Sequence, residues 1–205
     1  DLTVAIISDG TTIADAGAFS VNLGSMVHIK TLTASSSSTL SFVHGSSSVV
    51  LNSTYPIYKF QFINLHCGST EADFQVLYTT DGSNFNATQT STFFGAYHAE
   101  SGAYSGLSYY SANDVAQGST AGLGDSQSSN NDASLSGELT LFNPSSTTFV
   151  KHWIATTSLD EVNAANSNYT AGYVNTTSAV TGIRFKFDNS NIDAGKIKLY
   201  GIKDS

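Results

Sequence analysis

Apolar and polar residues alternate with a period of two through most of this chain. In the clearest segment, Ile183, Phe185 and Phe187 are separated from one another by charged residues. Consecutive strand residues point to opposite faces of a sheet, so the pattern predicts strands with one buried and one exposed face. The same alternation marks further candidate strands at 27–32, 39–43, 58–62, 74–78, 135–141, 149–154, 171–175 and 196–200.

Turn residues between these segments fit antiparallel pairing. Asp81-Gly82 follows the 74–78 segment, and an Asp-Gly pair supplies the positive φ that a tight hairpin needs. The stretch from Asp188 to Gly195 joins the last two alternating segments, which are therefore a predicted hairpin. No apolar repeat of helical spacing continues over ten residues. We predict an all-β fold, a jelly-roll-like sandwich of two antiparallel sheets with about nine or ten strands.

The chain is short enough to fold around one core, and we divide it only near its beginning. All-β sandwiches of about 200 residues commonly form a single domain. Residues 24–205 are therefore predicted to be one β-sandwich domain. Residues 1–23 are set apart by Gly24-Ser25 and are predicted to be an N-terminal arm or an edge strand.

Two stretches lack the strand pattern and are predicted to be loops. Residues Gly95 to Ala133 are rich in Gly, Ser and Asn, with a short helix at 113–117 as an alternative, and residues 156–169 are similar. Loops as long as the first are uncommon unless they are functional or disordered. Tyrosine offers a large amphipathic surface, so its four tyrosines are candidate interface or glycan-binding residues, unless they only pack the loop onto its own sandwich. They are Tyr97, Tyr104, Tyr109 and Tyr110.

Composition and charge exclude two classes of partner. The chain has 8 Lys and Arg against 16 Asp and Glu, a formal net charge of −8, and no basic run. Phosphate binding needs clustered cations, so we expect no nucleic-acid partner. No stretch approaches 18 consecutive apolar residues, so we expect no membrane span. Cys67 is the only cysteine, which excludes an internal disulfide and indicates assembly in a reducing compartment.

The sequence contains no recognisable motif for catalysis or metal binding. Residues 102–106 include Ser105 but do not match the G-x-S-x-G nucleophile motif, and residues 118–124 lack the lysine of a phosphate-binding loop. The five histidines are scattered without the spacing of metal ligands. We therefore expect no catalytic residue, no cofactor and no metal. Calcium in the Asp- and Asn-rich turns at 125–132 or 188–193 is an alternative, although Asx-turn hydrogen bonds explain the same residues.

Several phrases of the sequence together resemble a group of uncharacterised virion proteins from marine, cyanophage-like bacteriophages. Examples are GSMVHIK at 24–30, STYPIYKF at 53–60, LFNPSSTTFVKH at 141–152 and IKLYGI at 197–202. The matching text also covers 33–37, 62–66, 92–94 with 97–98, 171–173, 175–179 and 192–195, so that the resemblance spans residues 24–203. The residues before Gly24 have no counterpart, and Cys67 stands where the related phrase has proline.

The resemblance implies a virion structural role without a known activity. We expect a non-enzymatic protein of the particle exterior, either capsid decoration or part of a head or tail fibre, assembled in the host cytoplasm. Virion symmetry and exposed sheet edges favour a homo-oligomer, expected to be a trimer, that also contacts other virion proteins. Residues 1–22 or one sheet edge would dock on the particle, while residues 95–133 face outward or contact a neighbour.

Two alternative functions stay open at this point. The first is a glycan-binding adhesin of a tail fibre, in which the tyrosines bind a host surface glycan. The second is a hydrolytic tailspike, which requires a pair of carboxylates at a fixed separation in a cleft.

Overall fold

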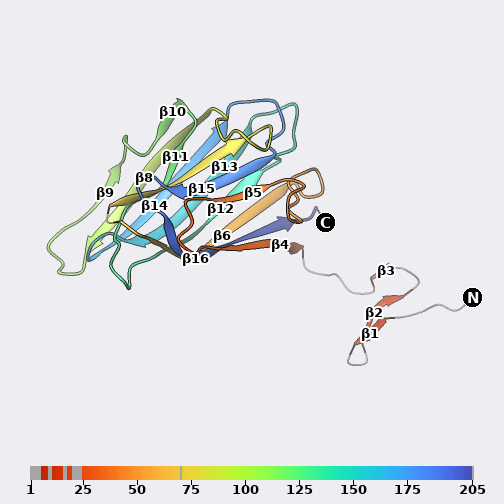
Figure 1. The fold of residues 1–205 in the computed structure, drawn as a ribbon, viewed down its shortest axis with the longest axis horizontal. Coiled ribbons are helices and arrows are strands. Elements are labelled where there is room, and N and C mark those ends of the chain that lie inside the picture. Colours follow the sequence, from red (N-terminus) through yellow and green to blue (C-terminus); the bar gives the residue numbers. More distant parts are fainter. Residues whose placement is uncertain (1–5, 9–10, 16–17, 20–24, 70, 205) are drawn as a thin grey trace, which may run out of the picture.

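The structure is a computed structural model that describes residues 6–8, 11–15, 18–19, 25–69 and 71–204. These residues form strands joined by turns and loops (Figure 1). Within them, no helix has the length and apolar character needed to cross a membrane. The strands are β1 (Ile6–Ser8), β2 (Thr11–Asp15), β3 (Ala18–Phe19), β4 (Met26–Thr33), β5 (Leu40–Val43), β6 (Ile57–Cys67), β7 (Ala72–Thr79), β8 (Gln89–Ala99), β9 (Ser105–Tyr109), β10 (Val115–Gly118), β11 (Ala121–Gln127), β12 (Leu135–Phe142), β13 (Lys151–Asp160), β14 (Ala164–Val174), β15 (Gly182–Phe187) and β16 (Ile192–Ile202).

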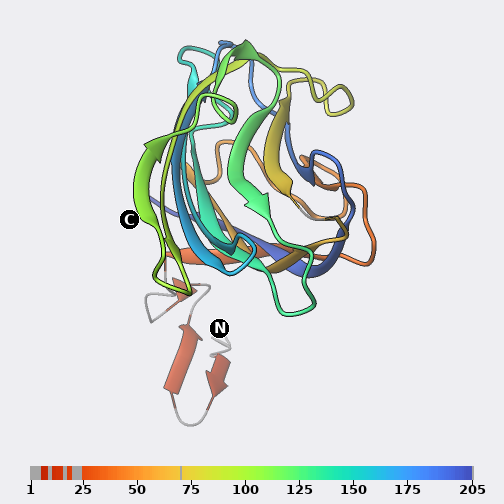
Figure 2. The ribbon, with the colours of Figure 1, turned by 90° about the vertical axis from the view of Figure 1, so that its left-hand side faces the viewer.

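Eight of these strands form a jelly roll, which confirms the predicted two-sheet antiparallel sandwich. Strands β4, β16, β6 and β12 lie side by side in that order, and β5, β15, β7 and β11 form the facing sheet. Along the chain, these eight strands cross between the sheets at every step except from β7 to β11. Eight strands wound in this way between two sheets are the jelly-roll arrangement. Figure 2 shows the two layers facing each other.

Two insertions widen one of the sheets, and we call their five strands the extension. Strands β8, β9 and β10 lie between β7 and β11 in the chain, whereas β13 and β14 lie between β12 and β15. In space, β13 pairs with β12, β14 with β13, and β8 with β14, while β9 and β10 share the far side of β8. The large sheet therefore has nine strands, and β11 of the small sheet packs over the inner face of the extension.

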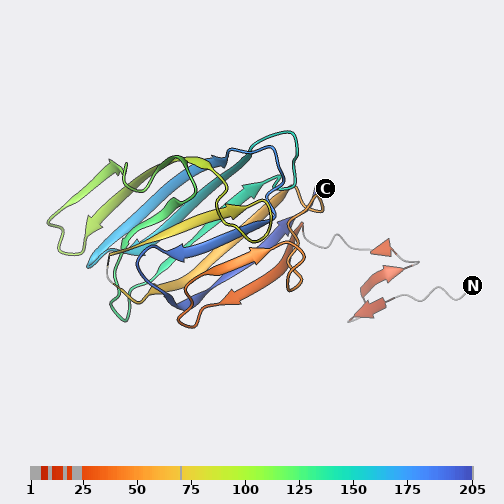
Figure 3. The same ribbon diagram turned by 45° about the horizontal axis from the view of Figure 1, so that its top comes forward.

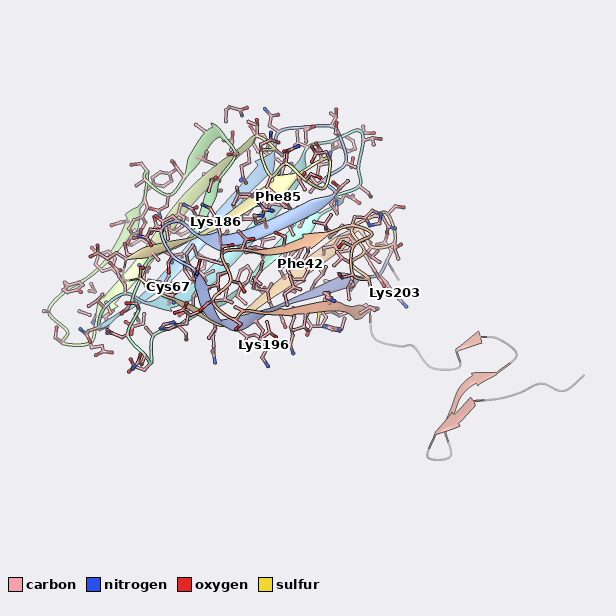
Figure 4. The ribbon with its side chains drawn as sticks, in the orientation of Figure 1. Phe42, Cys67, Phe85, Lys186, Lys196 and Lys203 are labelled. Carbon is pink, nitrogen blue, oxygen red and sulfur yellow. The ribbon has the colours of Figure 1, made fainter. Side chains whose placement is uncertain are left out.

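A cluster of phenylalanine rings fills the space between the sheets. Phe185 of β15 lies at its centre, with ring centroids of four other phenylalanines 5.1 to 6.4 Å away. Figure 4 shows one of them, Phe42, between the ribbons of β5 and β6. Ile183, Phe185 and Phe187 are all buried, as the alternating pattern predicted. On the opposite side of β15, the Arg184 guanidinium lies 3.8 Å from the centroid of the Phe85 ring.

The predicted loop from Gly95 to Ala133 is wrong in its main part, because this stretch contains the end of β8 and all of β9, β10 and β11. The short helix considered at 113–117 is also absent, since β10 begins at Val115. The sequence of β11 does not show an alternation of apolar and polar residues, because small residues such as glycine occupy several of its buried positions. A Cβ on Gly124 of β11 would lie 2.7 Å from Cδ1 of Leu135, so only glycine fits there without a shift.

The second predicted loop, residues 156–169, is also wrong, because β13 and β14 run through it and leave only a short turn at 161–163. Their inward positions hold Thr157, Asn166 and Asn168, which are buried although they are polar. A hydropathy pattern cannot register a strand whose inner face is polar.

The predicted N-terminal arm or edge strand, residues 1–23, is described only in part. Strands β1, β2 and β3 form a small antiparallel sheet, and their described ladders join them only to one another. The remaining residues of this segment, 1–5, 9–10, 16–17 and 20–23, lie outside the described part of the chain. The division between 1–23 and 24–205 stays a prediction.

Candidate functional site

The outer face of the nine-stranded sheet carries a continuous row of aligned side chains. The strand register places one residue of each strand beside the next, from β9 at one edge to β4 at the other. On β8 and β13, exposed residues alternate with buried ones, so the row points away from the facing sheet. In spatial order the row is Tyr109, Phe94, Tyr169, Thr156, Glu138, Gln61, Lys198 and Thr31.

One end of this row is aromatic and exposed. The rings of Phe94 and Tyr169 are stacked, with centroids 5.4 Å apart and planes inclined by 14°. Tyr109, beside Phe94, is 57% exposed, and Leu107 on the same strand is 73% exposed. The Tyr109 hydroxyl donates a hydrogen bond to Oδ2 of Asp114, and this bond raises the pKa of Tyr109. Large apolar side chains gathered on an exposed face mark interaction surfaces. Figure 3 shows the β8–β9 hairpin at one end of the sandwich.

A shallow groove of about 620 Å³ lies at the middle of the row. It runs over β6, β12, β13 and β14, and its lining includes Gln61, Glu138, Thr156 and Tyr169. Glu138 is paired with Lys59, whose Nζ lies 2.9 Å from Oε2 of the carboxylate. The groove therefore combines an aromatic wall with hydroxyl, amide and paired charged groups, and polar groups placed beside an aromatic surface can orient a bound ligand.

A buried polar layer lies on the other, inner face of the extension. Asn166 and Asn168 of β14 are both fully buried. The side chain of Asn166 donates a hydrogen bond of 2.8 Å to Glu161, whereas neither amide atom of Asn168 has a partner among the described residues. Strand β11 packs over this layer.

Asp125 of β11 has the most strongly raised carboxyl pKa among the described residues. Burial raises the pKa of Asp125 to about 6, helped by the negative charges of Asp73 and Glu161. Asp73 accepts a hydrogen bond of 3.0 Å from the side chain of Asn113 and one of 2.9 Å from the Ser126 amide. The carboxylate of Asp73 in β7 thereby holds together β7, β11 and the turn before β10.

The Asp- and Asn-rich turns raised the alternative of bound calcium. Among the described residues, no group of three or more His, Cys, Asp or Glu is arranged to hold a metal ion. Asp188 and Asp193 line an open hollow of about 590 Å³, where Oδ1 of Asp188 accepts hydrogen bonds from the backbone amides of Asp73 and Asn189. This carboxylate is thus engaged in the kind of local hydrogen bonding that an Asx turn makes.

The four candidate tyrosines do not form one surface. Tyr97 lies on the inner side of β8, and its ring centroid is 6.1 Å from that of Tyr104, which is 53% exposed. Tyr110 packs edge-to-face on Phe93, with centroids 5.6 Å apart. Only Tyr109 belongs to the outer row.

The sequence interpretation missed Phe94, Tyr169 and Glu138 as site residues. Phe93 and Phe94 are adjacent, so one of the two had to point outward if the segment was a strand, and this signal was available. The sequence around Tyr169 contains no comparable indication. Tyr169 lies beside Phe94 and Thr156 only because β14 pairs with β8 and β13.

Comparisons of the chain with protein-family models, with curated proteins and with solved structures found no match.

Proposed function

We propose that this chain is a non-catalytic structural protein of the exterior of a bacteriophage particle, and that it acts by assembling with further copies of itself. The proposal rests on the sequence resemblance and on one observation in the fold, the unprotected edge formed by β9. Expected partners are a homo-oligomer, taken to be a trimer, and neighbouring virion proteins.

Strand β9 has the properties of an edge that binds another chain. Within the described ladders it pairs only with β8, so one side of its backbone has no strand partner. Its five residues, Ser105–Tyr109, carry no charge, and Leu107 is 73% exposed. Natural proteins protect edge strands with charges, proline or a covering segment, and an exposed uncharged edge favours association.

The opposite edge of the large sheet differs in character. Strand β4 carries His28 and Lys30, and its outward His28 ring packs against Tyr200 with centroids 5.4 Å apart. A contact between two unlike edges is heterologous, and repeated contacts of this kind form a ring where the rotation between copies closes and an open filament where it does not. This supports a cyclic assembly such as a trimer over a two-fold pair.

The hydrogen bonds of two carboxyl groups, Asp73 and Asp188, support the non-catalytic part of the proposal. Asp73 is hydrogen-bonded to Asn113 and to the Ser126 amide, and Asp188 to two backbone amides. A glycosidase needs two carboxyl groups that are free to meet a substrate in a cleft. A substrate-turnover screen of the purified protein with polysaccharides tests this point, and hydrolysis of any of them would contradict it.

The assembly proposal is tested by the mass of the purified chain in solution. We expect a trimer by light scattering coupled to size exclusion, and a shift toward monomer in the variant Leu107→Lys, which places a charge on the edge. The matched control is Phe149→Lys, because Phe149 is 72% exposed but lies in a loop away from β9. A monomeric wild type, or a variant with unchanged mass, would refute assembly through β9.

A second candidate function, a glycan-binding adhesin, is favoured by a separate observation, the groove beside Tyr169. The two functions are compatible, because the groove lies over β6, β12, β13 and β14 and not at the β9 edge.

A further inference from the structure

The groove on the outer face lies where a row of small side chains stands beside a row of larger ones. Its floor is formed by Ser136 of β12, Ser158 of β13 and Ser167 of β14, which are neighbours in the strand register. Gly137 adjoins this floor only through its backbone, because its register partners Phe62 and Thr157 are buried and the position faces the core. Larger residues, Glu138 and Tyr169, rise beside this floor. The sheet is thus hollowed at its middle, where a flat sheet would present a level surface.

Tyr169 forms one wall of the groove with a free ring face. The register places Tyr169 between Thr156 of β13 and Phe94 of β8. One face of its ring is stacked on Phe94, so the opposite face is turned toward Thr156 and the groove. Tyr169 is 43% exposed, and the stacking contact with Phe94 restricts the orientation of its ring. An exposed aromatic face beside polar groups suits the flat apolar face of a sugar ring.

The polar groups of the groove match hydroxyl groups and carry no unbalanced charge. The Gln61 side chain and the hydroxyls of Thr156 and Ser158 can each donate and accept hydrogen bonds, as sugar hydroxyls also do. The Ser136 hydroxyl already exchanges hydrogen bonds with Asn64. Glu138 is the only charged residue in the lining, and Lys59 neutralises it at 2.9 Å. An anionic ligand would meet no free cation in this lining, so the charge pattern favours a neutral ligand.

The groove does not suit a peptide partner. All four of its strands have neighbours on both sides, so none offers a free backbone edge for strand addition. Its lining divides about evenly between polar and apolar surface, and its volume of about 620 Å³ lies within the usual range for small-ligand sites. An extended chain of hydroxyl-bearing rings fits this shape better than apolar side chains do.

We infer that this groove is a binding site for a short segment of a neutral polysaccharide, with Tyr169 as the stacking wall and Gln61, Glu138 and Thr156 as hydrogen-bonding partners. The inference rests on the second proposed function, the glycan-binding adhesin, and is independent of assembly through β9. It moves the glycan contact from the tyrosines of residues 95–133 to β6, β12, β13 and β14.

The test uses the full chain and defined probes. Tetrasaccharides of β-1,4-linked glucose, α-1,6-linked mannose and β-1,4-linked galactose are titrated against the protein by NMR, with a sulfated galactan as an anionic comparator. We expect at least one neutral probe to bind at millimolar concentration or better, and the affinity to change little when salt is raised.

Variants then locate the site. Tyr169→Ala is expected to weaken binding by at least about tenfold, since truncating an aromatic anchor has effects of this size. Ser158→Phe, which fills the groove, should abolish binding. The matched control is Tyr173→Ala, because Tyr173 lies on the same face of β14 but not in the groove lining. Circular dichroism verifies that each variant is folded.

Three results would overturn the inference. These are no binding of any neutral probe at millimolar concentration, binding that survives both Tyr169→Ala and Ser158→Phe in folded protein, or binding confined to the sulfated probe. Leu107→Lys should leave glycan affinity unchanged while it alters the mass of the assembly. Failure of the groove inference and failure of the assembly proposal are therefore distinguishable.

Discussion

The raised pKa of Asp125 predicts a specific dependence of stability on pH. Burial raises this pKa from 3.8 to about 6, and the charges of Asp73 and Glu161 add to the effect. A carboxyl group whose pKa is higher in the folded state favours folding while it is protonated. Its favourable contribution is therefore complete below pH 3.8 and is lost as the pH rises through about 6.

The size of the effect follows from the shift. A shift of about two units corresponds to about 3 kcal/mol if the group were fully shielded from water. Asp125 is only partly buried, so solvent screens its interactions, and we expect a loss on the order of 1–2 kcal/mol between pH 4 and pH 7.5. Asp125→Asn keeps the shape and an oxygen that can accept the hydrogen bond from Asn113, but it removes the titration.

Urea denaturation at pH 4, 6 and 7.5 measures this difference. Relative to the wild type, Asp125→Asn should gain on the order of 1–2 kcal/mol as the pH rises across that window. Asp132→Asn is the control, because Asp132 is an exposed residue of the neighbouring loop. Comparing the unfolding free energy of Asp125→Asn with that of Asp132→Asn at each pH separates the titration of Asp125 from that of the other groups, which both variants share. If the stability of Asp125→Asn ran parallel to that of the wild type at all three pH values, the buried position of this carboxyl group would be refuted.

Three further predictions test the core and the close contacts. Phe185→Ala removes the ring at the centre of the aromatic cluster and should cost about 3–5 kcal/mol of unfolding free energy in guanidinium titrations, and a loss below 1 kcal/mol would contradict the packing. Gly137→Ala forces a Cβ against the Thr156 carbonyl and should lower stability by about 1–3 kcal/mol, so a neutral result would argue against the close approach of β12 and β13. Cys67 is buried and burial raises the pKa of its thiol, so Ellman's reagent should react with it only after unfolding, and fast labelling of native protein would disprove its burial.

The sandwich could be predicted from the sequence where its inner face is apolar. Strands β6, β7, β15 and β16 place residues such as Phe60 and Phe185 at alternate positions, and the hydrophobic effect makes this pattern visible. In the extension only 149–154 and 171–175 were predicted as strands, and the rest escaped prediction because inward residues such as Thr157, Asn166 and Asn168 are polar. Those residues are buried by β11 and by one another, which depends on the assembled fold and not on local hydropathy.

The candidate site was harder to predict than the fold. Tyr109, one of the four tyrosines proposed from the sequence, lies exposed in the outer row, whereas its neighbours Phe94 and Tyr169 were not proposed. They belong to strands separated by many residues, and they meet because β14 pairs with β8 along its whole length. Register between distant strands is a property of the tertiary structure, and a single sequence carries little information about it.

The two insertions of the jelly roll cannot be separated from each other. Strands β14 and β8 come from different insertions, yet every residue of each is paired with the other, from Ala164 with Ala99 to Val174 with Gln89. Deleting either insertion alone would leave the other with an eleven-residue strand whose backbone hydrogen-bonding groups have lost their partner strand. Related chains should therefore carry both insertions or neither, and a shortened version for engineering has to remove the two segments together.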